Sequence, residues 1–513
     1  MHANQPAAVV TPDAGGQLEI QAGQAGARQV GARRLDKAVN GLRTTQPDFS
    51  AAQSMTRLQA CFISLLSCAG FAVWLAAPDV AGRLGLSLLA LAFVPVTLIR
   101  FMALWQLVRA NTAPPAHATA AIPESELAPY TLLVPLYLEG SVAAGLVRAM
   151  SALDYPPSQL EILFLTEADD DATRAALNAA GLGRHMQIVT VPDGAPRTKP
   201  RALNYGLTFA RGEFVGIYDA EDVPDPGQLR AAAAAFRSAG PETACVQARL
   251  SIYNPGRNFL TRQFTLEYAA LFDGILPALD RLGLPLPLGG TSNHFRRRDL
   301  ENAGAWDPFN VTEDADLGVR LARLQKRVAM LDSVTWEEAP DTLRSWLAQR
   351  TRWIKGWMQT YLVHMRDPAN LWRELGTRRF IGFQLIFGGL ILSALAHPFF
   401  YAAMVTGLID GTFLKLPVGG PDAALLWICC FNAAAGFASS IALVAMAVAR
   451  RGGRLLARSA LGLPLYWLAI SLASYRALVE IATRPHFWAK TPHKGLGRDA
   501  LEWPNRRGNA AGV

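Results

Sequence analysis

The stretch FVGIYDAED, residues 214–222, is a short apolar run that ends in three carboxylates. Such a run predicts a buried strand with acidic side chains at its carboxyl end. Similar runs lie around it: YTLLVPLY (130–137), LEILFL (160–165), MQIVTV (186–191) and CVQARLSI (245–252). Segments with helical spacing, such as residues 141–153 and 171–180, alternate with these runs. The alternation predicts an α/β domain with a mostly parallel sheet and helices on both faces.

Polar side chains gather where the predicted strands end, which is the edge at which ligands of parallel sheets bind. The clusters are Tyr137 and Glu139; Glu167 with Asp169, Asp170 and Asp171; Asp219, Glu221 and Asp222; and Glu313, Asp314 and Asp316. A single cluster is most simply a helix N-cap, because carboxylates suit the first turn of a helix. Several clusters at one edge repel each other unless a cation lies between them. Mg²⁺ or Mn²⁺, shared with a phosphate group, is the expected occupant.

A second pattern is QRTRW, residues 349–353. Gln349, Arg352 and Trp353 lie at i, i+3 and i+4 and therefore share one face of a helix. The planar fork of an arginine suits a phosphate, and an adjacent indole suits a stacked sugar ring. Trp346 and Trp357 are expected instead to anchor the helix among lipid headgroups.

Several common chemistries are excluded. The sequence contains no GxxxxGK[ST], GxGxxG, HExxH or GxSxG motif, which argues against the usual ATPases, dehydrogenases, metalloproteases and hydrolases. No nucleic-acid-binding motif is present, so nucleic acid is not an expected partner. The five cysteines form no CxxC pair and are expected to be reduced and buried.

Hydrophobic residues make up 51% of the chain and charged residues 18%, a balance that favours a membrane protein. Apolar runs long enough to cross a bilayer lie at residues 59–77, 84–108, 381–408 and 423–448. A shorter run at 460–475 is either a further span or, as the positive charge of the tail favours, a re-entrant or interfacial segment. Arg100, near the end of the second run, is expected to snorkel to the membrane interface.

These runs divide the chain into five parts. Residues 1–57 lack apolar periodicity and are expected to be a disordered cytosolic segment. Residues 58–110 would form two transmembrane helices, and residues 125–375 a cytosolic domain with an interfacial helix. Residues 380–480 would hold two to three transmembrane or re-entrant helices, and residues 484–513 a basic tail. The net charge of +8 fits the positive charge that membrane proteins keep on the cytoplasmic side.

The motifs resemble, in order, those of the family 2 glycosyltransferases. YDAED resembles the DxD region of the GT-A fold, VPLYLEG (134–140) the P-x-Y-x-E opening, KPRALN (199–204) the Lys-x-x-x-Leu-Asn stretch and TED (312–314) the base motif. QRTRW is similar to the QxxRW motif of the processive membrane synthases, such as the cellulose and poly-N-acetylglucosamine synthases. RPHFWAKTPHKG (484–495) resembles the tail of bacterial relatives. The resemblance implies a GT-A type nucleotide-sugar-binding domain flanked by transmembrane helices.

The resemblance also implies roles for the matching residues. Donor binding would fall to Tyr137, Glu139, Glu167, Lys199, Asn204, Asp219, Gln349 and Arg352. Asp219 would also bind the metal, with Glu221 or the adjacent Asp222 as a second ligand. Glu167 stands where the family usually has Asp.

The chemistry would fall to the TED motif and to QRTRW. Asp314 would be the general base that takes the proton of the acceptor hydroxyl, and Glu313 would orient it. Trp353 would bind the acceptor. GGTSNHF (289–295) would line the acceptor pocket, with His294 packed or hydrogen-bonded rather than catalytic.

The expected function is that of an inverting membrane glycosyltransferase in a bacterial inner membrane, with its catalytic domain in the cytoplasm. It would transfer a hexose from a nucleotide sugar, such as a UDP-sugar, to a growing β-linked polysaccharide. The alternatives are a non-processive enzyme that glycosylates a lipid or short acceptor, and a non-enzymatic membrane scaffold with a degenerate transferase domain. Expected partners are the nucleotide sugar, a glycan or lipid acceptor, membrane lipids and export or accessory subunits.

Overall fold

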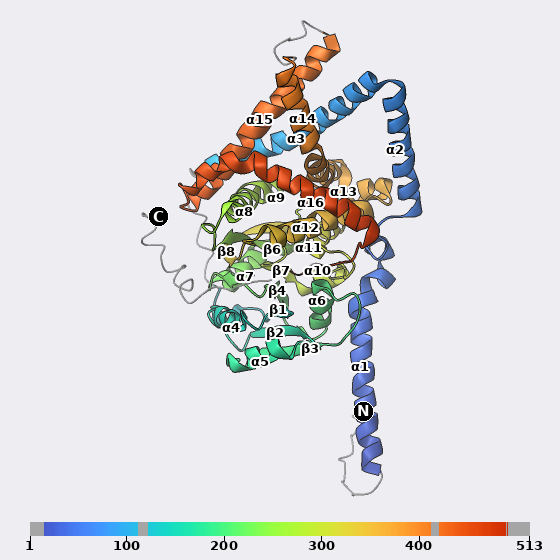
Figure 1. Ribbon diagram of the computed structural model, residues 1–513. Helices are drawn as coiled ribbons and strands as arrows, with labels where there is room; N and C mark the ends of the chain where they lie inside the picture. Colours follow the sequence, from blue (N-terminus) through green and yellow to red (C-terminus); the bar gives the residue numbers. More distant parts are fainter. Residues whose placement is uncertain (1–14, 111–121, 412–419, 489, 491–513) are drawn as a thin grey trace.

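One sheet forms the centre of the molecule (Figure 1). The computed structural model describes residues 15–110, 122–411, 420–488 and 490. In this part of the chain the strand order is β3-β2-β1-β4-β7-β6-β8-β5. The strands are β1 (Tyr130–Leu136), β2 (Leu160–Glu167), β3 (Met186–Val191), β4 (Phe214–Ile217), β5 (Val223–Pro224), β6 (Thr243–Ile252), β7 (Asn293–Arg296) and β8 (Arg327–Glu337). Strands β1 to β4 pair in parallel, and β7 runs antiparallel between β4 and β6. The predicted, mostly parallel sheet is confirmed.

Alternate residues of the strands face opposite sides of the sheet and build two cores. In β1, Leu133 joins one core, whereas Leu132 and Val134 join the other. Leu203 of α6 packs in the first core and Leu146 of α4 in the second, so helices cover both faces as predicted. The helices of this domain are α4 (Ala143–Ser151), α5 (Asp171–Ala179), α6 (Lys199–Leu207), α7 (Gln228–Ser238), α8 (Phe259–Ala269), α9 (Leu276–Arg281), α10 (Arg297–Asn302), α11 (Glu313–Arg323) and α12 (Leu343–His364).

Long apolar helices lie beyond one edge of this domain (Figure 1). They are α2 (Arg57–Ala76), α3 (Pro78–Ala110), α14 (Gly389–Ile409), α15 (Gly420–Arg450) and α16 (Leu463–Thr483), and the more polar α13 (Pro368–Phe383) precedes α14. Short 3₁₀ or π-helical segments join the longer elements: η1 (Pro47–Phe49), η2 (Glu124–Glu126), η3 (Ala270–Ile275), η4 (Gln384–Gly388) and η6 (Leu456–Gly462).

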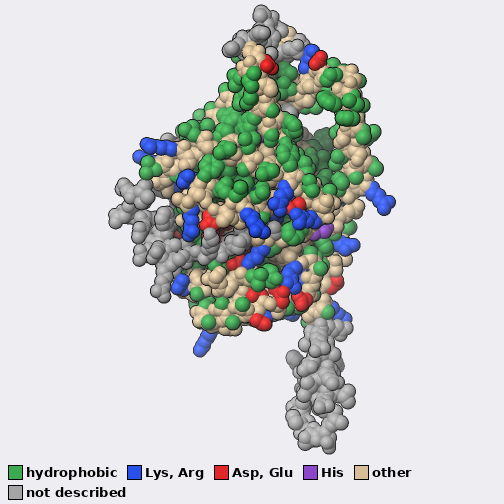
Figure 2. All heavy atoms as spheres, in the orientation of Figure 1, with side chains coloured by type: hydrophobic (Ala, Val, Ile, Leu, Met, Phe, Trp, Pro, Cys, Tyr) green, Lys and Arg blue, Asp and Glu red, His purple; other side chains and the backbone are tan. Residues whose placement is uncertain are grey.

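Four helical stretches in the described ranges are long and apolar enough to cross a membrane: Arg57–Ala76, Pro368–Ile409, Ala423–Arg450 and Leu456–Thr483. Helix α3, the second expected span, is one continuous helix but is not among these four. Hydrophobic side chains dominate the surface of the long helices, and charged side chains gather over the sheet domain (Figure 2). The distribution indicates a membrane protein with a polar domain attached to its membrane helices.

The disorder predicted for the N-terminal segment is wrong for residues 15–57, which form α1 (Gly15–Thr45) and a turn before α2. Ala38 and Leu42 are buried, and the Arg34 guanidinium lies 4.2 Å from the centroid of the Phe209 ring. Contacts with the sheet domain therefore stabilise a helix whose own sequence has little apolar periodicity. Residues 1–14 lie outside the described residues, as does the basic tail beyond residue 490.

The re-entrant or interfacial form favoured for residues 460–475 stays a prediction. These residues belong to η6 and α16, which together form one of the four candidate spans. The helix continues through Glu480, whose carboxylate lies 3.1 Å from the buried Lys355 ammonium. Because this charge is paired inside the protein, the helix extends beyond the apolar residues that the sequence marks.

Three side chains that were expected at the membrane interface make contacts inside the protein. Trp346 is fully buried and donates a hydrogen bond to the Tyr466 hydroxyl at 3.2 Å, so it is not a headgroup anchor. Trp357 is half-buried, with its ring centroid 4.7 Å from that of Phe387. Arg100 lines a cavity, and its expected position at the membrane interface stays a prediction.

The cysteines are free, as expected, but they are not all buried. Cys245 is buried in β6, whereas Cys61 and Cys68 are exposed on α2. An apolar helix that faces lipid can carry such side chains on its surface.

Candidate active site

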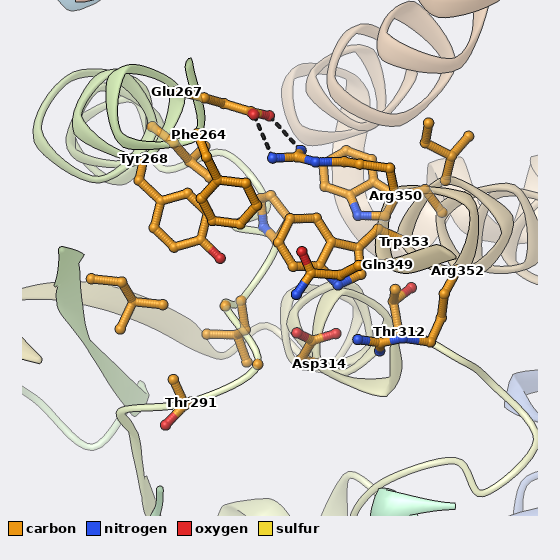
Figure 3. Close-up of a pocket in the computed structure, with 18 of the residues that line it drawn as sticks. Phe264, Glu267, Tyr268, Thr291, Thr312, Asp314, Gln349, Arg350, Arg352 and Trp353 are labelled. Atoms are coloured by element: carbon orange, nitrogen blue, oxygen red, sulfur yellow. Dashed lines mark hydrogen bonds and ion pairs between the residues drawn. The ribbon is translucent and has the colours of Figure 1, made fainter. Parts of the chain in front are cut away.

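A cavity of about 690 Å³ opens at the carboxyl ends of the strands and continues between the membrane helices. Most of the predicted site residues line it: Tyr137, Glu139, Glu167, Lys199, Asp219, Glu221, Glu313, Asp314, Gln349, Arg352 and Trp353. Asn204 and Asp222 do not line it. Figure 3 shows the part of the cavity where Asp314 at the start of α11 faces the side chains of α12.

The acidic wall of the cavity follows β4 and β8. Asp219 and Glu221 come after β4, and Glu337 ends β8. The Lys199 ammonium forms an ion pair with Asp219 and donates a hydrogen bond to the Gly290 carbonyl oxygen at 2.6 Å. Burial disfavours the charged form of Lys199, but the neighbouring carboxylates, Asp219 first, raise its pKa above the ordinary value. Glu337 had no counterpart among the predicted site residues, because its WEEAP context carries no known signature.

These acids fit a divalent cation. The pKa values of Glu221 and Glu337 are raised well above the ordinary value, first by burial and then by neighbouring carboxylates. The site therefore holds more carboxylate than Lys199 balances, and hard oxygen ligands suit Mg²⁺ or Mn²⁺. Within the described ranges, no three His, Cys, Asp or Glu side chains are grouped as ligands of one ion. An ion here would need further ligands, such as phosphate oxygens.

Asp222, the alternative metal ligand, is 1% exposed and does not reach the cavity. Its carboxylate accepts a hydrogen bond from the Asp219 backbone nitrogen at 2.7 Å and another from the Thr291 hydroxyl. Asp222 thus holds the loop that presents Asp219. The prediction of Asp222 as a possible metal ligand is wrong, because the turn after β4 directs its side chain into the protein.

Asp314 and Glu313 begin α11 and face the cavity. Burial raises the pKa of Asp314 above its ordinary value, although its carboxylate accepts a hydrogen bond from the Ala315 nitrogen at 2.8 Å. Burial and the adjacent Asp314 charge raise the pKa of Glu313 to about 7. A carboxylate with a raised pKa is a stronger proton acceptor, which suits a general base.

Asp316, the third acid of this helix start, has a structural role. It is fully buried, 2.7 Å from Arg320 and 3.0 Å from His364. These contacts fix the first turn of α11 against α12. A Cβ atom at Gly356 would lie 2.2 Å from the Thr312 hydroxyl, so only glycine lets the two helices approach this closely.

The shared face predicted for α12 is present, and it points into the cavity (Figure 3). Arg352 donates one long hydrogen bond, 3.4 Å, to the Val311 carbonyl oxygen. In the described part of the chain, the Arg352 Nε and the Gln349 Oε1 are buried without a hydrogen-bond partner. Buried polar atoms are normally satisfied, so these two are suited to bind a polar ligand.

Arg350, which the sequence reasoning missed, supports Trp353. Its guanidinium lies 4.7 Å from the Phe264 ring centroid and 4.6 Å from that of Trp353. Two hydrogen bonds, of 2.7 and 2.5 Å, join it to the Glu267 carboxylate (Figure 3). Arg350 lies inside QRTRW, but nothing in the sequence pairs it with Glu267 on α8.

Acidic and aromatic side chains line the cavity beyond β1 and β2 as well. Glu139 pairs with Lys490 at 3.0 Å, and Glu167 forms a buried ion pair with Arg201. Tyr137 accepts a hydrogen bond from Arg197 at 3.1 Å. All three predicted residues line the cavity, and their role in binding the base and ribose stays a prediction.

Asn204 and His294 lie away from the cavity. Asn204 donates hydrogen bonds to the carbonyl oxygens of Ala38 and Trp306, which fixes α1 against the sheet domain. The prediction that Asn204 lies beside the nucleotide is therefore wrong. His294 is fully buried, 2.7 Å from the Tyr130 hydroxyl, and burial lowers its pKa to about 3. It is a neutral, packed side chain of β7.

Residues 128–356 match the family model described as "Glycosyltransferase like family 2". The chain is 26% identical to "Probable glycosyltransferase YdaM" of Bacillus subtilis over 60% of its own length and 72% of that protein. It is 30% identical to "Beta-monoglucosyldiacylglycerol synthase" of Synechocystis sp. over 46% of its own length and 49% of that protein. The matched region holds the sheet, the acidic wall and QRTRW, so this part of the chain is similar to a family 2 glycosyltransferase domain.

Solved structures are more distant. A mannosyltransferase from Pyrobaculum calidifontis, in complex with GDP-Man and Mn²⁺, aligns with 78% of this chain and 99% of its own length. The TM-score is 0.45 and the sequence identity 19%.

Proposed function

We propose that the chain transfers a hexose from a nucleotide sugar to a hydroxyl group of a membrane lipid, with inversion at the anomeric carbon. One observation carries the proposal: Asp219, Asp314 and Arg352 come from three separate elements and face one cavity. An acid that holds a diphosphate, a base and a phosphate-binding cation are the groups that this reaction requires.

The acceptor hydroxyl would attack the anomeric carbon on the face opposite the diphosphate. Asp314 would accept the hydroxyl proton as the new bond forms, and the nucleoside diphosphate would leave with the electrons of the broken bond. Arg352 would stabilise the charge on that leaving group, in a buried site where such charge interactions are strong. A bound Mg²⁺ or Mn²⁺, held by Asp219 and Glu221, would neutralise part of the diphosphate charge.

The lipid acceptor follows from the wall of the cavity between the membrane helices. Its aliphatic residues are Val96, Ile99, Leu385, Ile386, Leu390, Ala394, Leu443, Val444 and Ile470. Two of the uncharged polar groups in this wall are already bonded to their own helices: Ser440 donates to the Gly436 oxygen at 2.7 Å, and His397 contacts the Ser393 oxygen at 2.5 Å. A glycan would leave most of its hydroxyls without partners here, whereas acyl chains would gain from burial. The relative named as a glucosyldiacylglycerol synthase agrees with this choice.

A growing β-linked polysaccharide is the second candidate acceptor. QRTRW favours it, because Trp353 offers a stacking surface to a sugar ring beside the predicted leaving group. In either case we propose that the catalytic domain faces the cytoplasm, since Arg33, Arg34, Lys37 and Arg43 precede the first candidate span.

The experiment uses the purified full-length chain in nanodiscs with Mn²⁺. UDP-sugars and GDP-mannose would be screened for release of the nucleoside diphosphate, with Asp314→Asn alongside. Release from one donor that Asp314→Asn abolishes would support the proposal. Equal release by both proteins would contradict the role of Asp314, and no release from any donor would favour a scaffold.

A further inference from the structure

Arg100 is a cation in the membrane-side part of the cavity. It lines the cavity from α3, with its guanidinium carbon 6.0 Å from the ring centroid of Trp467. Among the residues that the structure describes, no hydrogen bond or ion pair holds this guanidinium. The cavity residues that belong to α3, α14, α15 and α16 include no Asp or Glu in the described ranges. A charged group at such a position is costly unless an opposite charge compensates it.

The position of Arg100 along α3 is informative. Arg100 precedes the last residue of α3 by ten positions, which is about 15 Å at 1.5 Å per residue. The next turns, at Ala103 and Leu107, pack near Gly274 of η3 in the sheet domain. On the other side, the Phe93 ring lies 5.9 Å from that of His397. Arg100 therefore lies between the catalytic domain and the deeper, aliphatic part of the cavity.

We propose that Arg100 binds the phosphate group of an anionic acceptor lipid. The inference rests on the proposed function. The ligand would be a phospholipid whose headgroup carries a free hydroxyl beyond its phosphate. The hydroxyl would extend to Asp314, the phosphate would lie at Arg100, and the acyl chains would lie among the aliphatic residues of α14 and α15. The hydroxyl oxygen forms the bond to the anomeric carbon, its proton passes to Asp314, and the nucleoside diphosphate departs.

Charge and shape together favour this ligand over its alternatives. A neutral diacylglycerol would fill the aliphatic wall but leave Arg100 without an opposite charge. Inorganic phosphate would pair with Arg100 but would leave the aliphatic wall unfilled. An anionic phospholipid satisfies both parts of the cavity, and the guanidinium fork matches the geometry of phosphate oxygens.

Lipid binding can be measured without any donor. The full-length protein would be released from phosphatidylcholine nanodiscs that contain equal amounts of dioleoyl-phosphatidylglycerol and dioleoylglycerol, and retained lipids counted by native mass spectrometry. We expect Arg100→Gln to lower phosphatidylglycerol retention about tenfold or more, the usual size of a lost charge-assisted hydrogen bond, and to leave dioleoylglycerol retention unchanged. Arg109→Gln, an exposed position on the same helix outside the cavity lining, is the matched control and should retain phosphatidylglycerol like the unaltered protein. Equal retention by Arg100→Gln and Arg109→Gln would overturn the inference.

Activity separates this inference from the proposed function. With the donor found by the screen, the unaltered protein should glycosylate phosphatidylglycerol faster than dioleoylglycerol, and Arg100→Gln should abolish this preference. A glycosylated dioleoylglycerol with no phosphatidylglycerol product would overturn the inference and leave the lipid glycosyltransferase intact. A water-soluble glycan as the sole product would contradict the lipid acceptor itself.

Discussion

At the scale of single residues, the catalytic proposal depends on the protonation of Asp314. Burial raises the pKa of its carboxyl group, and a base must be ionised to accept a proton. We therefore predict that kcat falls as the pH drops through this raised pKa, above the ordinary value of 3.8. The measurement is the pH profile of nucleoside diphosphate release at saturating donor. An activity that rises on acidification would contradict the role of Asp314.

The acidic wall gives a prediction about metal. We expect EDTA to abolish activity and Mn²⁺ to restore it. Glu221→Gln should raise the Mn²⁺ concentration for half-maximal activity about tenfold or more, because the cavity loses one carboxylate ligand. Asp222→Asn should shift it less, since Asp222 bonds the Asp219 backbone and does not line the cavity. Equal shifts in the two variants would contradict the assignment.

The sequence predicted most of the residues that line the cavity, but not every contact among them. Asp219, Asp314 and Arg352 are visible because each sits in a motif at a predicted strand end or helix face. Asn204 sits in a motif too, yet its side chain bonds α1, which the sequence does not place. Glu337 and Glu267 are missed because their partners lie far away in the chain and meet them only after folding.

At the scale of elements, Trp353 depends on contacts between α8, α12 and α16. Arg350 lies against the Trp353 ring and is held by Glu267 and the Tyr466 hydroxyl. We predict that Glu267→Gln lowers kcat/KM for the acceptor about tenfold, because Arg350 loses the charge that holds it. The KM for the donor should stay close to that of the unaltered protein. Loss of donor affinity alone would contradict the placement of Trp353 at the acceptor.

The end of α16 depends on a buried charge pair. Lys355 is fully buried and lies 3.1 Å from Glu480. Glu480→Gln should destabilise the protein by about 3 kcal/mol, because the Lys355 ammonium keeps only uncharged hydrogen-bond acceptors. Thermal unfolding in detergent would measure this as a lower Tm. The double variant Lys355→Met, Glu480→Gln should recover part of the loss, and an unchanged Tm in Glu480→Gln would contradict the pair's role.

The observed ends of helices and strands agree with the predicted ends where the apolar pattern of the segment itself determines them. The strands β1, β2, β4 and β6 lie close to their predicted ranges, because each is buried on both faces. The edge strand β3 matches its predicted range as well, although Gln187 and Thr190 are exposed. The residue at which α16 ends, and the fact that α1 is an ordered helix, depend instead on partners far away in the chain, such as Lys355 and Phe209. A pattern confined to one segment cannot reveal them.

At the scale of the whole molecule, the cavity joins two environments. Its polar end holds the carboxylates of the sheet domain, and its other end lies among aliphatic side chains of the membrane helices. Under the proposed function, this continuity would bring a water-soluble donor and a membrane-embedded acceptor to the same carboxylate, Asp314. The sequence predicted the acidic strand ends and the apolar helices separately, and the fold joins them around one cavity.

The most direct test of this account is the chemical nature of the product. The full-length protein in nanodiscs would be incubated with the radiolabelled donor and Mn²⁺, and the label partitioned between chloroform and water. We predict labelled, chloroform-soluble glycolipid that carries a single sugar and is absent with Asp314→Asn. Label that stays in a water-soluble polymer, or a glycolipid that Asp314→Asn still makes, would contradict it.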